Sequence, residues 1–282
     1  MKNCWHRRRA GIAMIFLLSL TGLANASKLE DIAYGNDPAQ RMDVYLPDQA
    51  SSQRPLLVMV HGGAWRFGDK KNRAVVKNKI QRWVEQGWVL VSLNYRMLPD
   101  TPPDQQAKDI ASALAEVQKL APQWQADPKQ MVLMGHSAGA QLVAIIATNP
   151  ALTSAYPKLH WQGAILLDSA ALDITQIMEK RHPKLYDRAF GDEPEYWRQN
   201  SATHHLHAKV KPILLVCSNR RSDSCNQAES FSAKGKALGV ATTVLPQNLS
   251  HLAINSNLGS EGEYTEAVEK FMFQLTNFKN QP

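Results

Sequence analysis

Short apolar segments alternate along this chain with longer segments of helical periodicity, and this alternation limits the fold more than any other feature. The expected strands are Ile32–Tyr34, Arg41–Leu46, Leu56–His61, Val89–Tyr95, Gln130–Met134, Ala164–Leu167, Ile213–Cys217 and Thr242–Leu245. The expected helices are Asp104–Leu120, Ser137–Ala147, Gln227–Leu238 and Glu261–Phe278. Nearly continuous apolar runs suit strands buried on both faces, whereas Gly35-Asn36-Asp37-Pro38 suits the turn of an antiparallel edge hairpin. The order predicts an α/β fold with a mainly parallel eight-stranded sheet and helices on both faces.

The N-terminal segment is typical of a secretory signal peptide. Lys2 and Arg7-Arg8-Arg9 precede an apolar run, Ala10–Leu23, that ends in the small-residue site Ala24-Asn25-Ala26. The run is too short to span a bilayer comfortably. We therefore expect residues 1–26 to be removed and residues 27–282 to form a single domain. The mature chain should be periplasmic or secreted, without stable membrane insertion.

The net charge does not indicate a nucleic-acid partner. The formal value of +7 includes four basic residues of the N-terminal segment, and the other basic residues are interspersed with acidic ones.

The run His204-His205-x-His207 lacks a carboxylate at ligand spacing. Neither a metal ion nor an organic cofactor is therefore expected.

The strongest chemical signal is Gly135-His136-Ser137-Ala138-Gly139, which matches the pattern G-x-S-x-G. It follows an expected strand and opens an expected helix, whereas chance matches in unrelated proteins have no such context. The context predicts a sharp turn that presents the Ser137 hydroxyl as a nucleophile, with glycines where a Cβ would collide with neighbouring elements.

A second glycine-containing loop, His61-Gly62-Gly63-Ala64-Trp65, follows the apolar run Leu56–Val60. Backbone N–H groups fixed in such a loop stabilise the oxyanion that forms during acyl transfer. We expect the donors to be the amides of Ala138 and of Gly63 or Ala64. His61 is expected to hold the loop and not to act as the base.

The general base is expected at His251, which follows the last expected strand. In enzymes whose nucleophile lies in a G-x-S-x-G turn between a strand and a helix, the chain order is nucleophile, acid, histidine. The acid is expected at Asp223, the only acidic residue in the loop 218–225, where it would orient the imidazole. Asp168 and Asp173, after the preceding strand, are the alternatives. The non-catalytic interpretation of Asp223 is a cap of the next helix.

Cys217 and Cys225 are the two cysteines that follow the N-terminal segment. An even pair in an oxidising compartment predicts a disulfide, and two free thiols are the alternative. The bridge would bracket the loop that carries Asp223 and stiffen it.

Together these motifs resemble the esterase and lipase branch of the α/β-hydrolases, which includes hormone-sensitive-lipase-like carboxylesterases and kynurenine formamidases. The resemblance also rests on Gly68-Asp69-Lys70, on Asn94-Tyr95-Arg96 with Pro99, and on Asp109. Ala64-Trp65 departs from the HGGG pattern and is similar to the HGGxW form of formamidases and of feruloyl and acetyl esterases. The resemblance covers most of the mature chain and implies the α/β-hydrolase fold.

The expected activity is hydrolysis of a small carboxylic ester through an acyl-enzyme on Ser137. Amide or formamide hydrolysis is the alternative, because the same three side chains serve both bonds. A rival of another class is a hydrolase fold retained only for binding. We expect the substrate pockets to be built by Arg66–Asn72 and by the irregular stretch Asp173–His207, a candidate loop or small cap.

Overall fold

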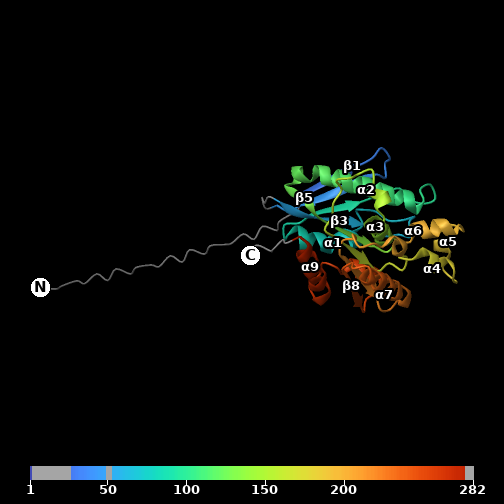
Figure 1. The fold of residues 1–282 in the computed structure, drawn as a ribbon. Helices are drawn as coiled ribbons and strands as arrows, with labels where there is room; N and C mark the ends of the chain where they lie inside the picture. Colours follow the sequence, from blue (N-terminus) through green and yellow to red (C-terminus); the bar gives the residue numbers. More distant parts are fainter. Residues whose placement is uncertain (2–26, 49–52, 277–282) are drawn as a thin grey trace.

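The computed structural model describes Met1, residues 27–48 and residues 53–276, so the expected signal sequence and its cleavage site lie outside the described residues. Within the described residues the sheet has eight strands in the order β1-β2-β4-β3-β5-β6-β7-β8 (Figure 1). The strands are β1 Ser27–Ala33, β2 Arg41–Leu46, β3 Arg54–Val60, β4 Val89–Leu93, β5 Ala126–His136, β6 Gly163–Leu167, β7 Ile213–Ser218 and β8 Thr242–Gln247. The pairs β1/β2 and β2/β4 are antiparallel and the other pairs are parallel, which confirms the predicted sheet and its edge hairpin.

Strand β5 is longer than expected and reaches the residue before Ser137. Gly135 pairs with Leu166 of β6, and His136 pairs with Leu167. The predicted strand ended at Met134, because glycine and histidine interrupt its apolar run. Their pairing with β6 places the following turn directly at the carboxyl edge of the sheet, where parallel α/β sheets form their sites.

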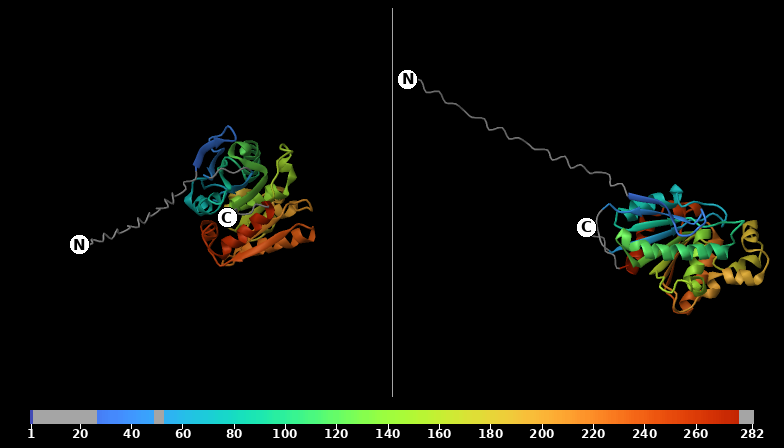
Figure 2. Two further views of the ribbon diagram at one scale, coloured as in Figure 1. Left: turned by 90° about the vertical axis from the view of Figure 1, so that its left-hand side faces the viewer. Right: turned by 90° about the horizontal axis from the view of Figure 1, so that it is seen from above.

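Helices cover both faces of the sheet because the side chains of each strand alternate between the faces. Leu56 and Val58 of β3 belong to the core beneath three helices, which are α2 Pro103–Leu120, α3 Ala138–Thr148 and α7 Ser222–Ala237. Leu57 and Met59 belong to the core on the other face, beneath α1 Arg73–Lys79, the π-helical turn η1 Ile80–Val84, α8 His251–Ser256 and α9 Glu263–Thr276. Figure 2 shows the sheet and these helices from two further directions. Among the described residues, no helix is both long and apolar enough to cross a membrane.

The stretch 173–207, expected to be irregular, is instead mostly helical. It contains α4 Ile174–Met178, α5 Lys184–Phe190, α6 Pro194–Asn200 and a 3₁₀ turn, Ala202–His205. Figure 1 shows α4, α5 and α6 gathered at one end of the sheet, on the other side of the molecule from α9. Pro183 and Gly191 bound α5, and Pro194 begins α6. Each of the three helices is too short to show a helical period in the sequence.

Candidate active site

Ser137 lies in the turn between β5 and α3, as the G-x-S-x-G pattern predicts. Its backbone has φ of 56° and ψ of −120°, a conformation that non-glycine residues rarely adopt. The Ser137 amide donates to the carbonyl of Leu167 on β6 at 2.9 Å, and its own carbonyl accepts from the amides of Ala140 and Gln141. Strained backbone of this kind persists only where the surrounding structure holds it, as these three bonds do.

The flanking glycines are required because three backbone segments meet at this turn. A Cβ at Gly135 would collide with the backbone of Gly139, and a Cβ at Gly139 would collide with the carbonyls of Val60 and His61. A Cβ at Gly62 would lie 2.8 Å from the Cβ of Ser137. The loop after β3 therefore lies directly against Ser137.

His251 lies at the start of α8, after β8, and its imidazole faces Ser137. Its Nε2 is 2.9 Å from Ser137 Oγ. The backbone carbonyl of His251 is 2.9 Å from Nε2 of His136, whose ring lies 4.6 Å from the His251 ring. The structure thus brings together the predicted nucleophile and base across 114 residues of sequence.

The carboxylate beside His251 belongs to Asp168, not to Asp223. His251 Nδ1 is 2.6 Å from Asp168 Oδ2, and the Asp168 side chain is fully buried just after β6. Asp168 was one of the alternatives, and its position directly after an apolar strand is the sequence signal that favours it. Neither Asp223 nor Asp173 makes a contact with His251.

The prediction of Asp223 as the acid is wrong because α7 begins earlier than its apolar pattern suggests. The helix starts at Ser222, so Asp223 lies in its first turn, where a carboxylate is favoured by the helix dipole. The Asp223 side chain is 61% exposed, and it pairs with Arg221 and with the amide of Ser224. Asp173 is likewise used locally, as the cap of α4.

Asp168 is ionised in this environment. Burial by itself would raise the pKa of the Asp168 carboxyl, but hydrogen bonds from His251, from the Ser224 hydroxyl and from the Ser218 amide, together with the charge of Arg221, hold its pKa well below the usual range. The backbone of Asp168 also has a positive φ, 53°, and its amide donates to Val216 at 2.7 Å. A buried anion is therefore held at a fixed position opposite the imidazole.

Arg221 is a neighbour of this pair that the sequence did not indicate. Its Nη1 lies 2.8 Å from Asp168 Oδ2 and 2.7 Å from His251 Nδ1. When Nδ1 carries the proton that it donates to Asp168, both nitrogens are donors, so the hydrogen bond of Arg221 goes to Asp168. Through Nη2 the same guanidinium pairs with Asp223.

His136, between Gly135 and Ser137, stays neutral. Burial, and then the neighbouring His251, lower the pKa of His136 to about 3. A neutral imidazole that meets a carbonyl through Nε2 carries its proton there, so His136 donates to the backbone of His251. It thereby connects the turn that carries Ser137 with the loop that carries His251.

The loop His61–Trp65 is shaped by unusual backbone conformations and by buried contacts. Ala64 and Trp65 have φ of 52° and 58°, and Gly63 has φ of 134°. Among the residues that the structure describes, the amides of Gly63 and Ala64 donate no hydrogen bond to another protein group, and Ala138 begins α3 with its amide outside the helix ladder. These are the three amides expected to face an oxyanion.

His61 has the loop-holding place that was predicted for it. It is buried, its Nδ1 is 2.9 Å from the carbonyl of Gly62, and its ring stacks on Tyr95. The Tyr95 hydroxyl donates to the carbonyl of His61 at 3.0 Å. Burial lowers the pKa of His61, so the ring is uncharged. Tyr95, in the segment Asn94-Tyr95-Arg96, therefore supports the loop.

Asp109 supports that segment and hydrogen-bonds to neither Ser137 nor His251. It accepts hydrogen bonds from the Arg96 amide at 3.1 Å, from Arg96 Nε at 2.9 Å and from Gln40 at 2.8 Å. The Asp109 carboxylate, on α2, is buried, and its ion pair with Arg96 holds the segment after β4 against this helix. Asp109 is thus a structural residue of the loop's scaffold.

Trp65 joins the loop to the α4–α6 cluster. Its indole is buried, donates to Gln141 of α3 at 2.9 Å, and packs edge-on against Phe190 of α5 at 4.9 Å. Tyr186, also on α5, lies 6.0 Å from the Trp65 ring. A pocket of about 320 Å³ lies between α4, α5 and α7, with Tyr186 and Asp223 among its lining residues.

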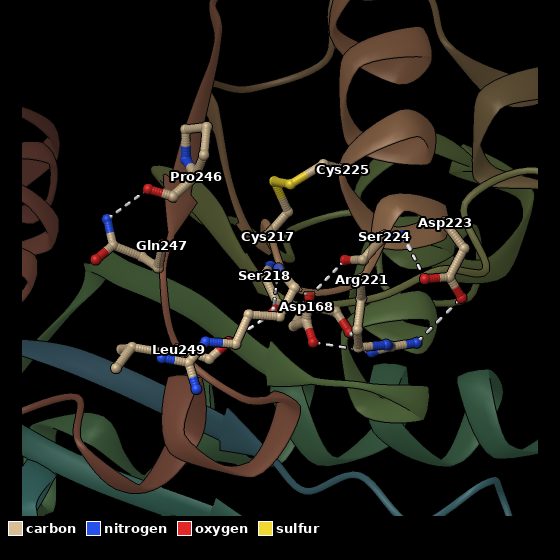
Figure 3. Close-up of a disulfide and its surroundings, with 11 residues drawn as sticks. Asp168, Cys217, Ser218, Arg221, Asp223, Ser224, Cys225, Pro246, Gln247 and Leu249 are labelled. Carbon is tan, nitrogen blue, oxygen red and sulfur yellow. Dashed lines mark hydrogen bonds and ion pairs between the residues drawn. A yellow bond between two sulfur atoms is a disulfide. The ribbon is translucent and has the colours of Figure 1, made fainter.

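Cys217 and Cys225 form a disulfide, as predicted, between the end of β7 and the first turns of α7 (Figure 3).

The histidines of the run His204–His207 point to separate partners. His204 lies 3.4 Å from Asp173, and His205 lies 3.0 Å from the carbonyl of Gln199. Within the described residues no group of three His, Cys, Asp or Glu side chains is arranged to hold a metal ion.

Curated relatives match this chain over about half of their own length. Esterase LipQ of Mycobacterium tuberculosis is 27% identical over 232 residues, which are 77% of this chain and 55% of LipQ. Kynurenine formamidase of Danio rerio is 30% identical over 155 residues, which are 53% of this chain and 48% of that protein.

Among solved structures, the truncated form of a carbohydrate esterase from gut microbiota superposes with a TM-score of 0.76. The two chains are 14% identical, and the alignment covers 91% of this chain and 99% of that one. At this identity the similarity establishes the fold, which is that of the α/β-hydrolases. A family model described as BD-FAE matches residues 42–234, more than half of the chain, including Ser137 and Asp168. The chain therefore belongs to the BD-FAE family.

Proposed function

We propose that this protein is a serine hydrolase that cleaves carboxylic esters through an acyl-enzyme on Ser137. One observation carries the proposal: Ser137 Oγ lies 2.9 Å from His251 Nε2, and His251 Nδ1 lies 2.6 Å from the buried carboxylate of Asp168. A nucleophile, a base and a group that orients the base are thus aligned by hydrogen bonds, as acyl transfer requires. Asp168 takes the role that the sequence assigned to Asp223.

The first half-reaction forms the acyl-enzyme. Nδ1–H of His251 donates to Asp168, so Nε2 has a free electron pair and takes the Ser137 proton as Oγ attacks the ester carbonyl. The carbonyl oxygen becomes an oxyanion, which the amides of Ala138 and of Gly63 or Ala64 would stabilise. The imidazolium then gives its proton to the alkoxide as the carbon–oxygen bond breaks, and the alcohol leaves.

The second half-reaction returns the free enzyme. A water molecule gives a proton to His251 Nε2 while its oxygen attacks the acyl carbon, which forms a second oxyanion at the same amides. Collapse of this intermediate breaks the bond to Ser137 Oγ, and Oγ recovers the proton from the imidazolium. Asp168 remains ionised throughout and stabilises the positive charge on His251.

We prefer ester hydrolysis to amide hydrolysis because LipQ, which aligns with 77% of this chain, is named an esterase. The formamidase relative, matched over 53% of the chain, keeps the amide bond as the second candidate. Initial rates on short acyl esters, feruloyl esters and N-formyl anilides, compared at equal concentration, separate the two. A higher kcat/KM on the anilides would reverse the assignment.

The mechanism is tested by Ser137→Ala, which should lower kcat by about 10⁴-fold to 10⁶-fold because the three side chains act as a unit. Ser154→Ala is the control, since Ser154 bonds only to its own turn. A fluorophosphonate probe should label the wild type and the control but not Ser137→Ala. Near-normal turnover by Ser137→Ala would overturn the proposal, and a wild type that is neither labelled nor active would point to a binding module.

We also propose that the mature protein is exported, on the basis of its N-terminal sequence. The Cys217–Cys225 disulfide supports this, because structural disulfides persist in oxidising compartments. N-terminal sequencing of the protein from a periplasmic or culture fraction should find a chain that starts near Ser27. An intact Met1 start on the mature form would contradict the proposal.

A further inference from the structure

The two oxygens of the Asp168 carboxylate have different partners. Oδ2 faces His251 Nδ1 and Arg221, as described above. Oδ1 accepts from the hydroxyl of Ser224 at 2.5 Å and from the amide of Ser218 at 2.7 Å. Ser224 is fully buried, so no water competes for this hydrogen bond. The two bonds to Oδ1 thus fix the rotation of the carboxylate, and this rotation places Oδ2 opposite His251 Nδ1.

The two donors to Oδ1 are the immediate sequence neighbours of the disulfide. Ser218 follows Cys217 at the end of β7, and Ser224 precedes Cys225 in α7. Figure 3 shows both serines next to the bridge, with the Asp168 side chain between them and Arg221. The bridge therefore fixes the distance between the strand end and the helix start, and with it the separation of the two donors.

Ser218 reaches the loop of the base as well. Its hydroxyl donates to the carbonyl of Leu249 at 2.5 Å, two residues before His251. The amide of Asn219 donates to the carbonyl of Gln247 at 3.1 Å. The end of β7, which carries Cys217, therefore holds both the loop that precedes His251 and the carboxylate of Asp168.

We propose that Ser224 and Ser218, held at a fixed separation by the Cys217–Cys225 disulfide, are positioning residues that orient the Asp168 carboxylate toward His251, so that turnover depends on the oxidised bridge. This inference rests on the proposed function of Ser137, His251 and Asp168. Ser224 touches neither His251 nor Ser137, and it acts only through Asp168. Its loss should therefore change kcat and leave substrate binding intact.

The first test compares two buried serines of the same helix. Ser224→Ala removes the donor to Asp168, whereas Ser232→Ala removes a hydroxyl that bonds to Thr242 at 2.9 Å, away from the site. Each loses a buried hydrogen bond, so both should unfold at lower temperature. Only Ser224→Ala should lower kcat, on the order of tenfold with KM unchanged, because a charge-assisted bond to Asp168 is lost. Equal kcat values for the two variants would overturn the role of Ser224.

The second test opens the bridge. Dithiothreitol supplies two electrons and two protons, which convert the disulfide to two thiols, and is itself oxidised to its cyclic disulfide. With two thiols counted per chain and the circular dichroism unchanged, kcat of the wild type and of Ser232→Ala should fall several-fold. In Ser224→Ala the further loss should be small, because the bridge and the serine act on the same carboxylate.

The outcomes separate this inference from the proposed function. Unchanged kcat in the reduced wild type, or the same reduction effect in all three proteins, would overturn the coupling of the bridge to Asp168. If reduction unfolds the chain, the comparison of the two serine variants under oxidising conditions decides. Failure of the proposed function would appear separately, as near-normal turnover by Ser137→Ala.

Discussion

The turn that carries Ser137 and the surroundings of Asp168 are built in different ways. At the turn, shape is set by close backbone approach, so that Gly135 and Gly139 are required within two residues of the serine. Asp168 is held by partners that follow it by 50, 56 and 83 residues, which are Ser218, Ser224 and His251. The Ser137 turn depends on a local steric requirement, which a short sequence motif reveals. The surroundings of Asp168 form only when β6, β7 and α7 come together, so no short motif reveals them.

The largest expected effect distinguishes the two acidic residues considered for the second region. Asp168→Asn should lower kcat by about 10⁴-fold, because the amide no longer holds the imidazole in the productive tautomer. Asp223→Asn is the matched control, and its 61% exposed side chain should leave kcat within about threefold of the wild type. Steady-state kinetics on one short-chain ester measures both. A larger loss in Asp223→Asn would restore the sequence-based assignment.

A smaller effect is expected when the packing at the turn is disturbed. In Gly62→Ala the new Cβ would lie 2.6 Å from the carbonyl of His136 and 2.8 Å from the Cβ of Ser137, so the loop His61–Trp65, with its proposed oxyanion donors, must move. Loss of one oxyanion donor lowers kcat by about 10²-fold to 10³-fold.

Gly239→Ala is the control for that variant. Gly239 has φ of 79° and open space around it, so alanine there should reduce stability by about 1–2 kcal/mol without changing kcat. Chemical denaturation and kinetics on the same samples separate the two effects. Equal kcat losses would mean that the loop–serine approach is not what matters.

The smallest effect concerns His136, which connects the two regions. A histidine in the unfolded chain has a pKa near 6.5, whereas the pKa of His136 is lowered to about 3. Between these values the unfolded chain binds a proton that the folded protein does not, so stability falls as the pH drops below about 6.5. His136→Gln keeps a donor for the His251 carbonyl but removes this titration. The loss of unfolding free energy between pH 7 and pH 5 should shrink by about 2 kcal/mol.

Urea unfolding at the two pH values measures that difference. The m-value at pH 7 should match that of the wild type, which shows that the variant unfolds from the same structure. Parallel pH dependence in the two proteins would show that His136 titrates normally. It would also contradict the neutral imidazole described for this turn.

Sequence reasoning predicted positions correctly where a local pattern or the chain order sets them. The strand-to-helix turn placed Ser137, the glycine loop placed Gly62 beside it, and chain order placed His251. It failed at Asp223 because the start of α7 is polar, Ser222 to Asn226, and shows no apolar period. Arg221 and Ser224 were not found because their roles depend on three-dimensional contacts with Asp168. The short helices of 173–207 were missed because each spans only five to seven residues, too few to show a helical period.

The packing of Trp65 against α5 has a consequence for how the proposed hydrolase can diversify. Tyr186 lines the pocket beside α7 and also lies against the indole of Trp65, two residues beyond Gly63 in the loop His61–Trp65. If the proposed hydrolase binds part of its substrate in this pocket, a change on α5 that reshapes the pocket also shifts a residue that supports the loop with the Gly63 and Ala64 amides. Selection for new specificity at this wall would then act on catalytic rate at the same time.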